Sequence, residues 1–185
     1  MSLKHALLGF LSYQPMTGYD LKQHFDRSIY YFWNAKLSQI YPTLNQMRED
    51  GWLTMEVDYQ EDRPNRKVYH ITDPGRDEFQ RWQQEPTGVS SIRVPFMIKV
   101  FFGGQLGKED MLAQLRHQMR LHQEQLAAYH EKVRMVMQQN VEATGMVREG
   151  IFWGLTLEMG IRYEQGWIEW CEEAIEKIEA MDDDQ

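Results

Sequence analysis

Short polar and basic side chains gather in one stretch, residues 36–46, in a pattern that is typical of a helix that reads DNA. Glutamine and asparagine can read an adenine through two hydrogen bonds, and serine, threonine, tyrosine and lysine can bind phosphate. Apolar residues recur in the same stretch at helical spacing, so the polar ones fall on the other side. The polar residues are Lys36, Ser38, Gln39, Tyr41, Thr43, Asn45 and Gln46. An ordinary solvent-exposed helix has a similar pattern, so this stretch alone leaves both interpretations open.

A second group of cations lies further along the chain. Arg63, Arg66 and Lys67 fall within five residues, where a β-hairpin is expected to turn. Basic side chains at the tip of a hairpin can contact the DNA backbone or minor groove. The adjacent Glu61 and Asp62 weaken the positive potential, and a solvated turn has a similar composition. This basic cluster therefore adds weight only if it belongs to the same domain as the polar helix.

The sequence contains no arrangement that is typical of catalysis or metal binding. There is no Ser-His-Asp signature, no glycine-rich phosphate loop and no cysteine–histidine spacing suited to zinc. His117, His122 and His130 are poorly spaced for one helical face and are expected to be solvated or packed. We predict no catalytic residues, no metal and no cofactor, and a protein that is not an enzyme.

The composition is that of an ordinary globular chain. Hydrophobic residues make up 42% and charged residues 26%, so the chain can bury a core. The single cysteine, Cys171, excludes an intramolecular disulfide and is expected to be packed in a helical core, which favours a cytoplasmic protein. Charges interrupt every apolar run before it reaches the length of a membrane span, so no membrane association is expected.

The net charge of −8 argues at first against nucleic acid, because phosphate binding needs positive potential. The acidic residues are unevenly distributed, however. Residues 1–84 contain 10 basic and 11 acidic residues, whereas residues 85–185 contain 10 and 17. The first half is nearly neutral, so the positions of individual charges matter more than their sum.

Three helices are expected before the basic cluster. The first spans residues 3–13, and the second begins at Thr17, which can form a capping box with Asp20. The apolar face of the second is expected to comprise Tyr19, Leu21, Phe25, Ile29 and Phe32. The third runs over residues 38–50 and ends at Gly51. Its buried face is expected to comprise Ile40, Leu44 and Met47.

The pattern then changes from helical to alternating. Residues 53–59 and 67–72 are expected to form the two strands of a hairpin, and residues 75–84 a further helix. Three helices followed by a hairpin is the order of a winged helix-turn-helix. Residues 1–84 are therefore predicted to be a winged-helix DNA-binding domain.

Long helices are predicted to dominate the second half, so the fold class is mainly α. After a linker at residues 85–94, a helical domain is expected at residues 95–181, followed by an acidic tail at 182–185. Its helices are expected near residues 96–102, 112–136 and 147–181. Apolar residues recur in the two long helices at intervals of three and four, the pattern of helices that pack along one another.

This apolar pattern predicts that the two long helices of the second domain bind a partner, which the family resemblance given below implies is a second copy of the chain. The residues expected in the dimer interface are Leu112, Leu115, Met119, Leu126, Leu155, Met159, Trp167, Trp170, Ala174 and Ile178. Glycines in the last helix are expected to allow close approach of a neighbouring helix. They lie at positions 150, 154, 160 and 166.

Specific segments of the first half resemble the PadR family of transcriptional regulators. They are Leu8-Gly9-Phe10-Leu11, Thr17-Gly18-Tyr19-Asp20-Leu21, Gln39-Ile40-Tyr41-Pro42-Thr43-Leu44, Gly51-Trp52-Leu53, and Arg66-Lys67-Val68-Tyr69 with Ile71-Thr72 and Gly75. The second half is similar to the C-terminal region of the shorter PadR subgroup. This likeness rests on the segment 95–102 and the two long helices, and it is less diagnostic because amphipathic helices are common.

The resemblance implies a homodimer that binds an inverted-repeat operator in double-stranded DNA and represses a gene until a small molecule releases it. The residues that it places against DNA are Ser38, Gln39, Tyr41, Pro42 and Thr43, with Arg63, Arg66 and Lys67 in the wing. Lys36 and Asn45 join this set from the helix pattern. For a small aromatic effector, we hypothesise a pocket formed by Phe96, Phe101, Phe102, Trp153, Trp167 and Trp170, although ordinary core packing explains any one of them as well.

One alternative from another class stays open. A helical protein–protein interaction module, with a winged helix that does not read DNA, would explain the negative net charge.

Overall fold

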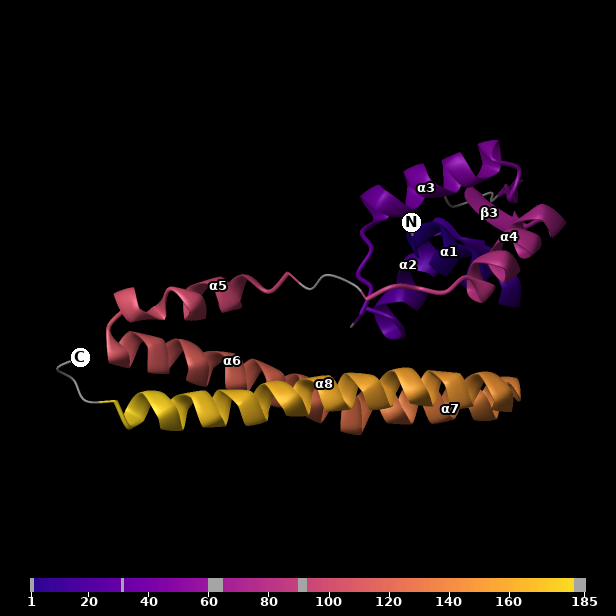
Figure 1. Ribbon diagram of the computed structural model, residues 1–185. Helices are drawn as coiled ribbons and strands as arrows, with labels where there is room; N and C mark the ends of the chain where they lie inside the picture. The colour runs from indigo at the N-terminus through magenta and orange to yellow at the C-terminus, as the bar shows by residue number, and fades with distance from the viewer. Residues whose placement is uncertain (1, 31, 60–64, 90–92, 182–185) are drawn as a thin grey trace. The chain divides into compact units, whose positions relative to one another are not determined.

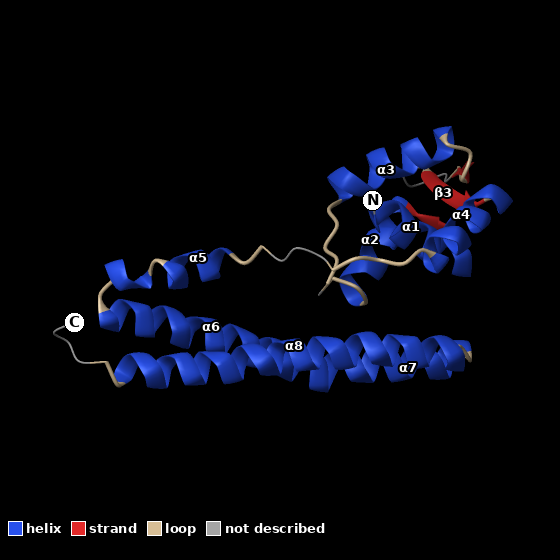
Figure 2. Ribbon diagram, viewed as in Figure 1, coloured by secondary structure: helices blue, strands red, loops and turns tan. Residues whose placement is uncertain are grey.

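The computed structural model describes residues 2–30, 32–59, 65–89 and 93–181 (Figure 1). The chain is mainly helical, with a small antiparallel sheet near the N-terminus (Figure 2). It divides into two compact units, Met1–Val89 and Ser90–Gln185. The predicted fold class, a winged helix followed by long helices, is confirmed.

The described residues of the first unit form four helices and three strands. They are α1 (Ser2–Tyr13), β1 (Met16–Thr17), α2 (Gly18–Arg27), α3 (Leu37–Glu49), β2 (Leu53–Asp58), β3 (Arg66–Ile71) and α4 (Asp73–Gln84). The strand order is β1-β3-β2, and Tyr69 of β3 lies between Met16 and Met55 in the register. The predicted hairpin is therefore part of a three-stranded sheet whose third member the sequence did not reveal.

Helix α2 begins as predicted and ends earlier than predicted. The Thr17 side chain accepts a hydrogen bond from the Asp20 amide at 3.1 Å, and the Asp20 carboxylate accepts one from the Thr17 amide at 3.1 Å, which completes the capping box. The helix stops at Arg27, where the Ser28 hydroxyl donates to the His24 carbonyl at 2.6 Å. Phe32 therefore lies outside the helix and is exposed, contrary to prediction. Tyr19 lies within the helix, but it too is exposed and not on the buried face.

One buried cluster joins the helices of the first unit to its sheet. Its members are Leu7, Leu8, Leu11, Met16, Leu21, Phe25, Ala35, Ile40, Leu44, Met47, Leu53 and Tyr69. Gly51 ends α3 with φ +77°, and the next amide, that of Trp52, donates to the Met47 carbonyl at 2.9 Å. This left-handed cap turns the chain from α3 into β2, as the sequence predicted.

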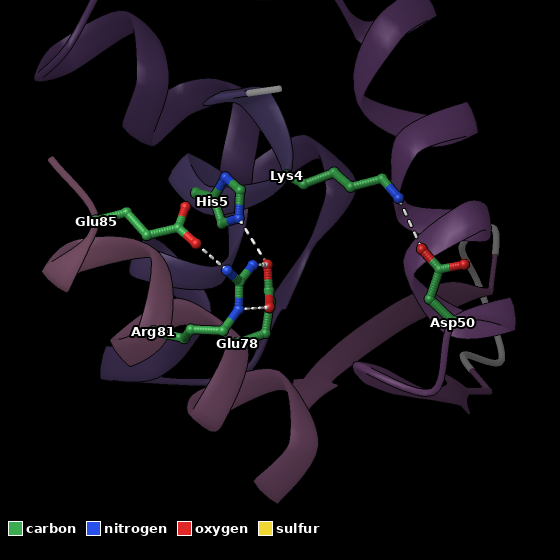
Figure 3. A network of polar contacts seen from close by, with 6 residues as sticks. All are labelled: Lys4, His5, Asp50, Glu78, Arg81 and Glu85. Atoms are coloured by element: carbon green, nitrogen blue, oxygen red, sulfur yellow. Dashed lines mark hydrogen bonds and ion pairs between the residues drawn. The ribbon is translucent and has the colours of Figure 1, made fainter. Parts of the chain in front are cut away.

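Polar contacts fasten α4 to α1 beside this core (Figure 3). Glu78 accepts from His5 Nε2 at 3.1 Å and from Arg81 at 2.7 Å, and His5 stacks on Trp82 at 4.5 Å between ring centroids. These hydrogen bonds, Arg81's before that of His5, lower the pKa of Glu78 from 4.5 to about 2. Arg81 also pairs with Glu85.

The second unit is a helical hairpin preceded by a short helix. Its elements are α5 (Pro95–Phe101), a 3-10 turn η1 (Gly103–Gln105), α6 (Lys108–Ala128), a π turn η2 (Tyr129–Val133), α7 (Arg134–Thr144) and α8 (Val147–Glu179). Helices α6 and α7 run along α8 (Figure 1). The helix predicted at residues 112–136 is part of a longer helical run, residues 108–144, which contains a π turn that the spacing of its apolar residues did not reveal.

Two buried clusters hold this hairpin together. Phe96, Met111, Leu115 and Cys171 form one, and Tyr129, Leu157 and Ile161 form the other. Cys171 is fully buried, as predicted, and burial raises the pKa of its thiol.

Two of the four predicted glycines in α8 serve close approach within the chain. A Cβ at Gly150 would lie 2.5 Å from Val141, and one at Gly160 would lie 3.1 Å from the Tyr129 ring. A Cβ at Gly154 or Gly166 would meet no described atom within 4 Å.

None of the described helices is both long enough and apolar enough to cross a membrane.

Candidate nucleic-acid interface

Helix α3 separates its apolar and polar side chains onto opposite sides. Ile40, Leu44 and Met47 are fully buried against the first unit. Thr43 is half-buried, and the other predicted contacts on this helix are exposed: Lys36, Ser38, Gln39, Tyr41, Pro42 and Asn45. The helix therefore presents a polar surface anchored by an apolar one, which is the arrangement that insertion into a major groove requires.

Local hydrogen bonds fix several of these polar side chains. The Gln39 Oε1 accepts from the backbone amide of Lys36 at 3.0 Å, and the Thr43 hydroxyl donates to the Gln39 carbonyl at 2.7 Å. Lysine has no side-chain acceptor, so only the glutamine half of a capping box forms at this helix end. At the other end, Gln46 Nε2 donates to Asp50 at 2.9 Å.

Tyr41 packs closely on the start of α2. A Cβ at Gly18 would lie 2.5 Å from Tyr41 Cε1, so only glycine allows the ring to take this position. Gly18 therefore serves the close approach of α2 and α3. Tyr41 remains exposed on its outer side.

A contact between distant residues holds the C-terminal end of α3. Lys4 of α1 donates to the Asp50 carboxylate at 2.7 Å (Figure 3) and lies over the Trp52 ring, 4.9 Å from its centroid. The hydrogen bond from Lys4, followed by that from Gln46, lowers the pKa of Asp50. Lys4 and Asp50 are 46 residues apart, so no local pattern could have predicted the contact.

The wing is described only at its base. Arg66 and Lys67 begin β3 and are exposed, whereas Arg63 lies outside the described residues. Arg66 Nη2 lies 3.2 Å from Asp20 Oδ2, so the capping carboxylate of α2 also holds the wing arginine. Burial acts to raise the pKa of Asp20, but the Thr17 hydrogen bonds and the charge of Arg66 outweigh it and lower that pKa. Sequence reasoning missed this second role of Asp20.

The structure groups only some of the hypothesised effector residues. Phe96, Trp167 and Trp170 contact one another, with ring centroids 5.4–6.4 Å apart. Phe101 and Phe102 instead pack edge to face on each other and are exposed, and Trp153 does not belong to the Phe96 cluster. His122 stacks on Trp167 at 4.7 Å, and its Nδ1 forms a hydrogen bond with the carboxylate of the buried Glu164.

The residues expected in a dimer interface divide into three sets by burial. Leu112 and Leu115 are buried within the single chain, so they form its core and are not available to a partner. A larger set is half-buried and packs against the two clusters of this unit: Met119, Leu126, Trp167, Trp170, Ala174 and Ile178. Leu155 and Met159 are exposed on α8. The same apolar pattern in the sequence therefore covers both intrachain packing and free surface.

Comparison with family models assigns both units. Residues 7–81 match the transcriptional regulator PadR-like family, and residues 92–179 match the virulence activator alpha C-terminal domain. The negative transcriptional regulator PadR of Bacillus subtilis is 26% identical over 96% of this chain and 97% of its own length. A probable transcriptional regulator of Mycobacterium tuberculosis is 48% identical over 86 residues, which are 46% of either protein.

Solved structures are similar over nearly the whole chain. Bacillus subtilis PadR in complex with operator DNA has a TM-score of 0.80 at 25% identity and covers 96% of this chain and 99% of its own. The Vibrio cholerae virulence activator AphA has a TM-score of 0.77 at 30% identity and covers 98% of this chain and all of its own. A complex of Bacillus subtilis PadR with p-coumaric acid shares the fold, with a TM-score of 0.76 at 23% identity over 97% and 99% of the two chains.

These relatives are transcriptional regulators and not enzymes, in agreement with the prediction from the sequence. Because the PadR-like match, the second family match and the full-length relatives agree, this chain belongs to the PadR-like family of transcriptional regulators.

Proposed function

We propose that two copies of this chain bind an inverted-repeat operator in double-stranded DNA, each placing α3 in a major groove. The observation that carries this proposal is the exposed polar face of α3 opposite its buried apolar face. The contacts proposed are Lys36 directly before this helix, Ser38, Gln39, Tyr41, Pro42, Thr43 and Asn45 on it, and Arg63, Arg66 and Lys67 in the wing.

The charge around α3 supports contact with a polyanion despite the negative net charge. The first turn of the helix contains no carboxylate, and Lys36 stands directly before it. The positive end of the helix dipole is thus not neutralised from within the helix. Lys67 adds an exposed cation at the base of the wing, and the exposed Arg66 beside it pairs with Asp20. These groups suit phosphate contacts that position the helix for base reading.

An exposed apolar stripe on α8 supports the dimer. Val147, Ile151, Leu155 and Met159 recur every four residues and are all more than half exposed. Such a stripe on one helix face is suited to burial against a second copy. A dimer would hold two α3 helices over half-sites about one helical turn apart, roughly 34 Å.

We include repression and release by a small aromatic compound in the proposal. The Bacillus subtilis relative is a negative regulator, and a structure of that protein contains p-coumaric acid. In this chain the cluster of Phe96, Trp167 and Trp170 offers aromatic rings for such a compound. A ligand that binds better to the non-operator conformation releases DNA through that difference in affinity alone.

The test of DNA binding is a titration of the full chain against the duplex that flanks its own gene, at several salt concentrations. The expected result is a shifted complex whose affinity falls steeply as salt rises. Lys67→Gln should reduce the slope of log affinity against log salt by about 1. Lys177→Gln, which removes the same charge from an exposed position on α8, should leave the slope unchanged.

An absence of binding at low salt, or equal slopes for Lys67→Gln and the wild type, would contradict the proposed interface. The first result would favour the protein–protein interaction module instead.

Release is tested by adding p-coumaric acid to the protein–DNA complex and following tryptophan fluorescence and operator affinity. The compound should quench fluorescence and weaken operator binding together. If neither changes with p-coumaric acid or with other planar aromatic acids, the effector part of the proposal fails while DNA binding stands.

A further inference from the structure

We infer that Gln39 reads DNA only as a hydrogen-bond donor and selects guanine at its position in the half-site, instead of the adenine that glutamine commonly reads. This inference rests on the proposed insertion of α3 into a major groove. It concerns the base that one side chain selects, which neither the fold nor the family determines.

The geometry commits the oxygen of Gln39 to the protein. Its Oε1 lies 3.0 Å from the backbone nitrogen of Lys36. A backbone N–H can only donate, so the atom that faces it must be the carboxamide oxygen, and the orientation of the amide is fixed. The Lys36 amide is one of the orphan donors at the start of a helix, and this bond satisfies it. The oxygen therefore has a structural role before DNA arrives.

The nitrogen of the same amide is available. Gln39 is exposed, and within the described part of the chain no hydrogen bond of its Nε2 is found. The carboxamide thus turns its oxygen toward the helix end and offers its two N–H donors to a partner.

Adenine and guanine present different hydrogen-bonding groups in the major groove, so a glutamine that offers only donors can tell them apart. Adenine presents an acceptor, N7, beside a donor, the N6 amino group, and reading both requires the oxygen and the nitrogen of a glutamine together. Guanine presents two acceptors, N7 and O6. A side chain that offers donors alone matches guanine, and it leaves the adenine amino group without a partner.

Gln46, two helical turns further along α3, provides a contrast. Its Nε2 donates to Asp50 at 2.9 Å, which uses one of its two N–H groups and leaves its oxygen available. Gln46 therefore retains the donor and acceptor that adenine requires, whereas Gln39 does not. Two chemically identical side chains on one helix are given different reading properties by their local hydrogen bonds.

The substitution Gln39→Glu separates the structural role from the reading role. A carboxylate still accepts from the Lys36 amide and is favoured in the first turn of a helix, but it has no N–H to donate. It should instead accept from the N4 amino group of cytosine. The added negative charge weakens binding to every sequence alike, so it cancels when the four base pairs at one position are compared.

The experiment selects binding sites for the full-length protein from a random double-stranded library, for the wild type and for Gln39→Glu in parallel. Titrations of the selected site then exchange each base pair, and replace each guanine by 7-deazaguanine, which lacks the N7 acceptor. The thermal midpoint of Gln39→Glu should be at least that of the wild type, and that of Gln39→Ala should be lower because the Lys36 amide loses its acceptor.

The expected result is one position in each half-site at which the wild type prefers guanine over adenine by roughly fivefold or more. 7-Deazaguanine should weaken binding by a similar factor at that position only, and Gln39→Glu should change the preference there to cytosine. An adenine preference that Gln39→Ala abolishes would overturn the inference. So would a uniform loss of affinity with an unchanged motif, which would identify a phosphate contact. If the wild type enriches no sequence, the proposed function itself fails, and this inference fails with it.

Discussion

Helices α3 and α8 both bury apolar residues, but they leave different kinds of side chain exposed to solvent. In α3 the residues Ile40, Leu44 and Met47 are fully buried, and the face left in solvent is polar. In α8 the side chains of Leu155 and Met159 are 55% and 65% exposed. A polar exposed face suits a wet, charged partner such as DNA, whereas an exposed apolar stripe loses its contact with water only against another protein surface. The comparison supports the proposed contact of α3 with DNA and of α8 with a second copy of the chain.

The largest expected effect comes from placing a charge in the apolar stripe of α8. A two-fold dimer contains the substitution Leu155→Glu once in each copy. Each leucine that the interface buries contributes about 1.5–3 kcal/mol to the free energy of association. The dimer dissociation constant should therefore rise by roughly 100-fold or more. Sedimentation or light scattering across a concentration series measures this. Gln165→Glu adds the same charge at an exposed polar position of α8 and should leave the dimer intact. A Leu155→Glu protein that dimerises like the wild type would remove this role from α8.

A buried residue of α3 should behave differently. Leu44→Ala leaves a cavity in the core of the first unit and should cost about 2–5 kcal/mol of unfolding free energy. Chemical denaturation of the wild type and the variant at the same protein concentration measures the loss. Asn45→Ala, at the exposed neighbouring position, should change stability by no more than about 0.5 kcal/mol. Similar losses in both variants would show that α3 does not have the two distinct faces described above.

Local signals in the sequence predicted much of the fold. Helical periodicity and capping residues placed α1, α3 and the start of α2 within one residue of their observed ends. These signals act over four or five neighbouring positions, so they can be read without knowing the tertiary structure. Strand β1 was not predicted, because its two residues are too few to show an alternating pattern.

Which surface covers an apolar face is not a local property. Leu115 and Leu155 belong to similar patterns in two helices, yet Leu115 is fully buried and Leu155 is more than half exposed. Periodicity identifies the apolar side of a helix and not its neighbour. The candidate site shows the same limit: residue types predicted the polar face of α3, but the contacts of Lys4 with Asp50 and of Asp20 with Arg66 join positions 46 residues apart.

The glycines that end α3 and α7 should show an intermediate effect. Gly51 and Gly145 adopt φ +77° and φ +71°, in the left-handed region, so Gly51→Ala and Gly145→Ala should each cost about 1–2 kcal/mol. Thermal unfolding of each variant measures the cost. Gly88→Ala is the control, since a Cβ meets no described atom within 4 Å at any of the three positions but Gly88 is not among the glycines with a positive φ. If Gly145→Ala proves neutral while Gly51→Ala does not, the end of α7 adjusts to a side chain and the hairpin of the second unit is the more adaptable of the two regions.

The smallest expected effect is the dependence of the first unit's stability on pH, which arises from Glu78. Its pKa is about 2 in the folded protein against an ordinary 4.5, first because Arg81 and then because His5 hydrogen-bonds its carboxylate. A lowered pKa stabilises the folded state fully above pH 4.5, and this contribution disappears as the pH falls from 4.5 to about 2. Glu78→Gln should lower the thermal midpoint at neutral pH and make it less dependent on pH between these values.

Glu85→Gln is the matched control for that dependence, because Glu85 pairs with the same arginine from a more exposed position. It should retain the slope of the wild type between pH 4.5 and 2. Equal slopes in all three proteins would mean that the carboxylate of Glu78 does not fasten α4 to α1. The apolar core alone would then stabilise the first unit, much as apolar clusters hold α6 on α8.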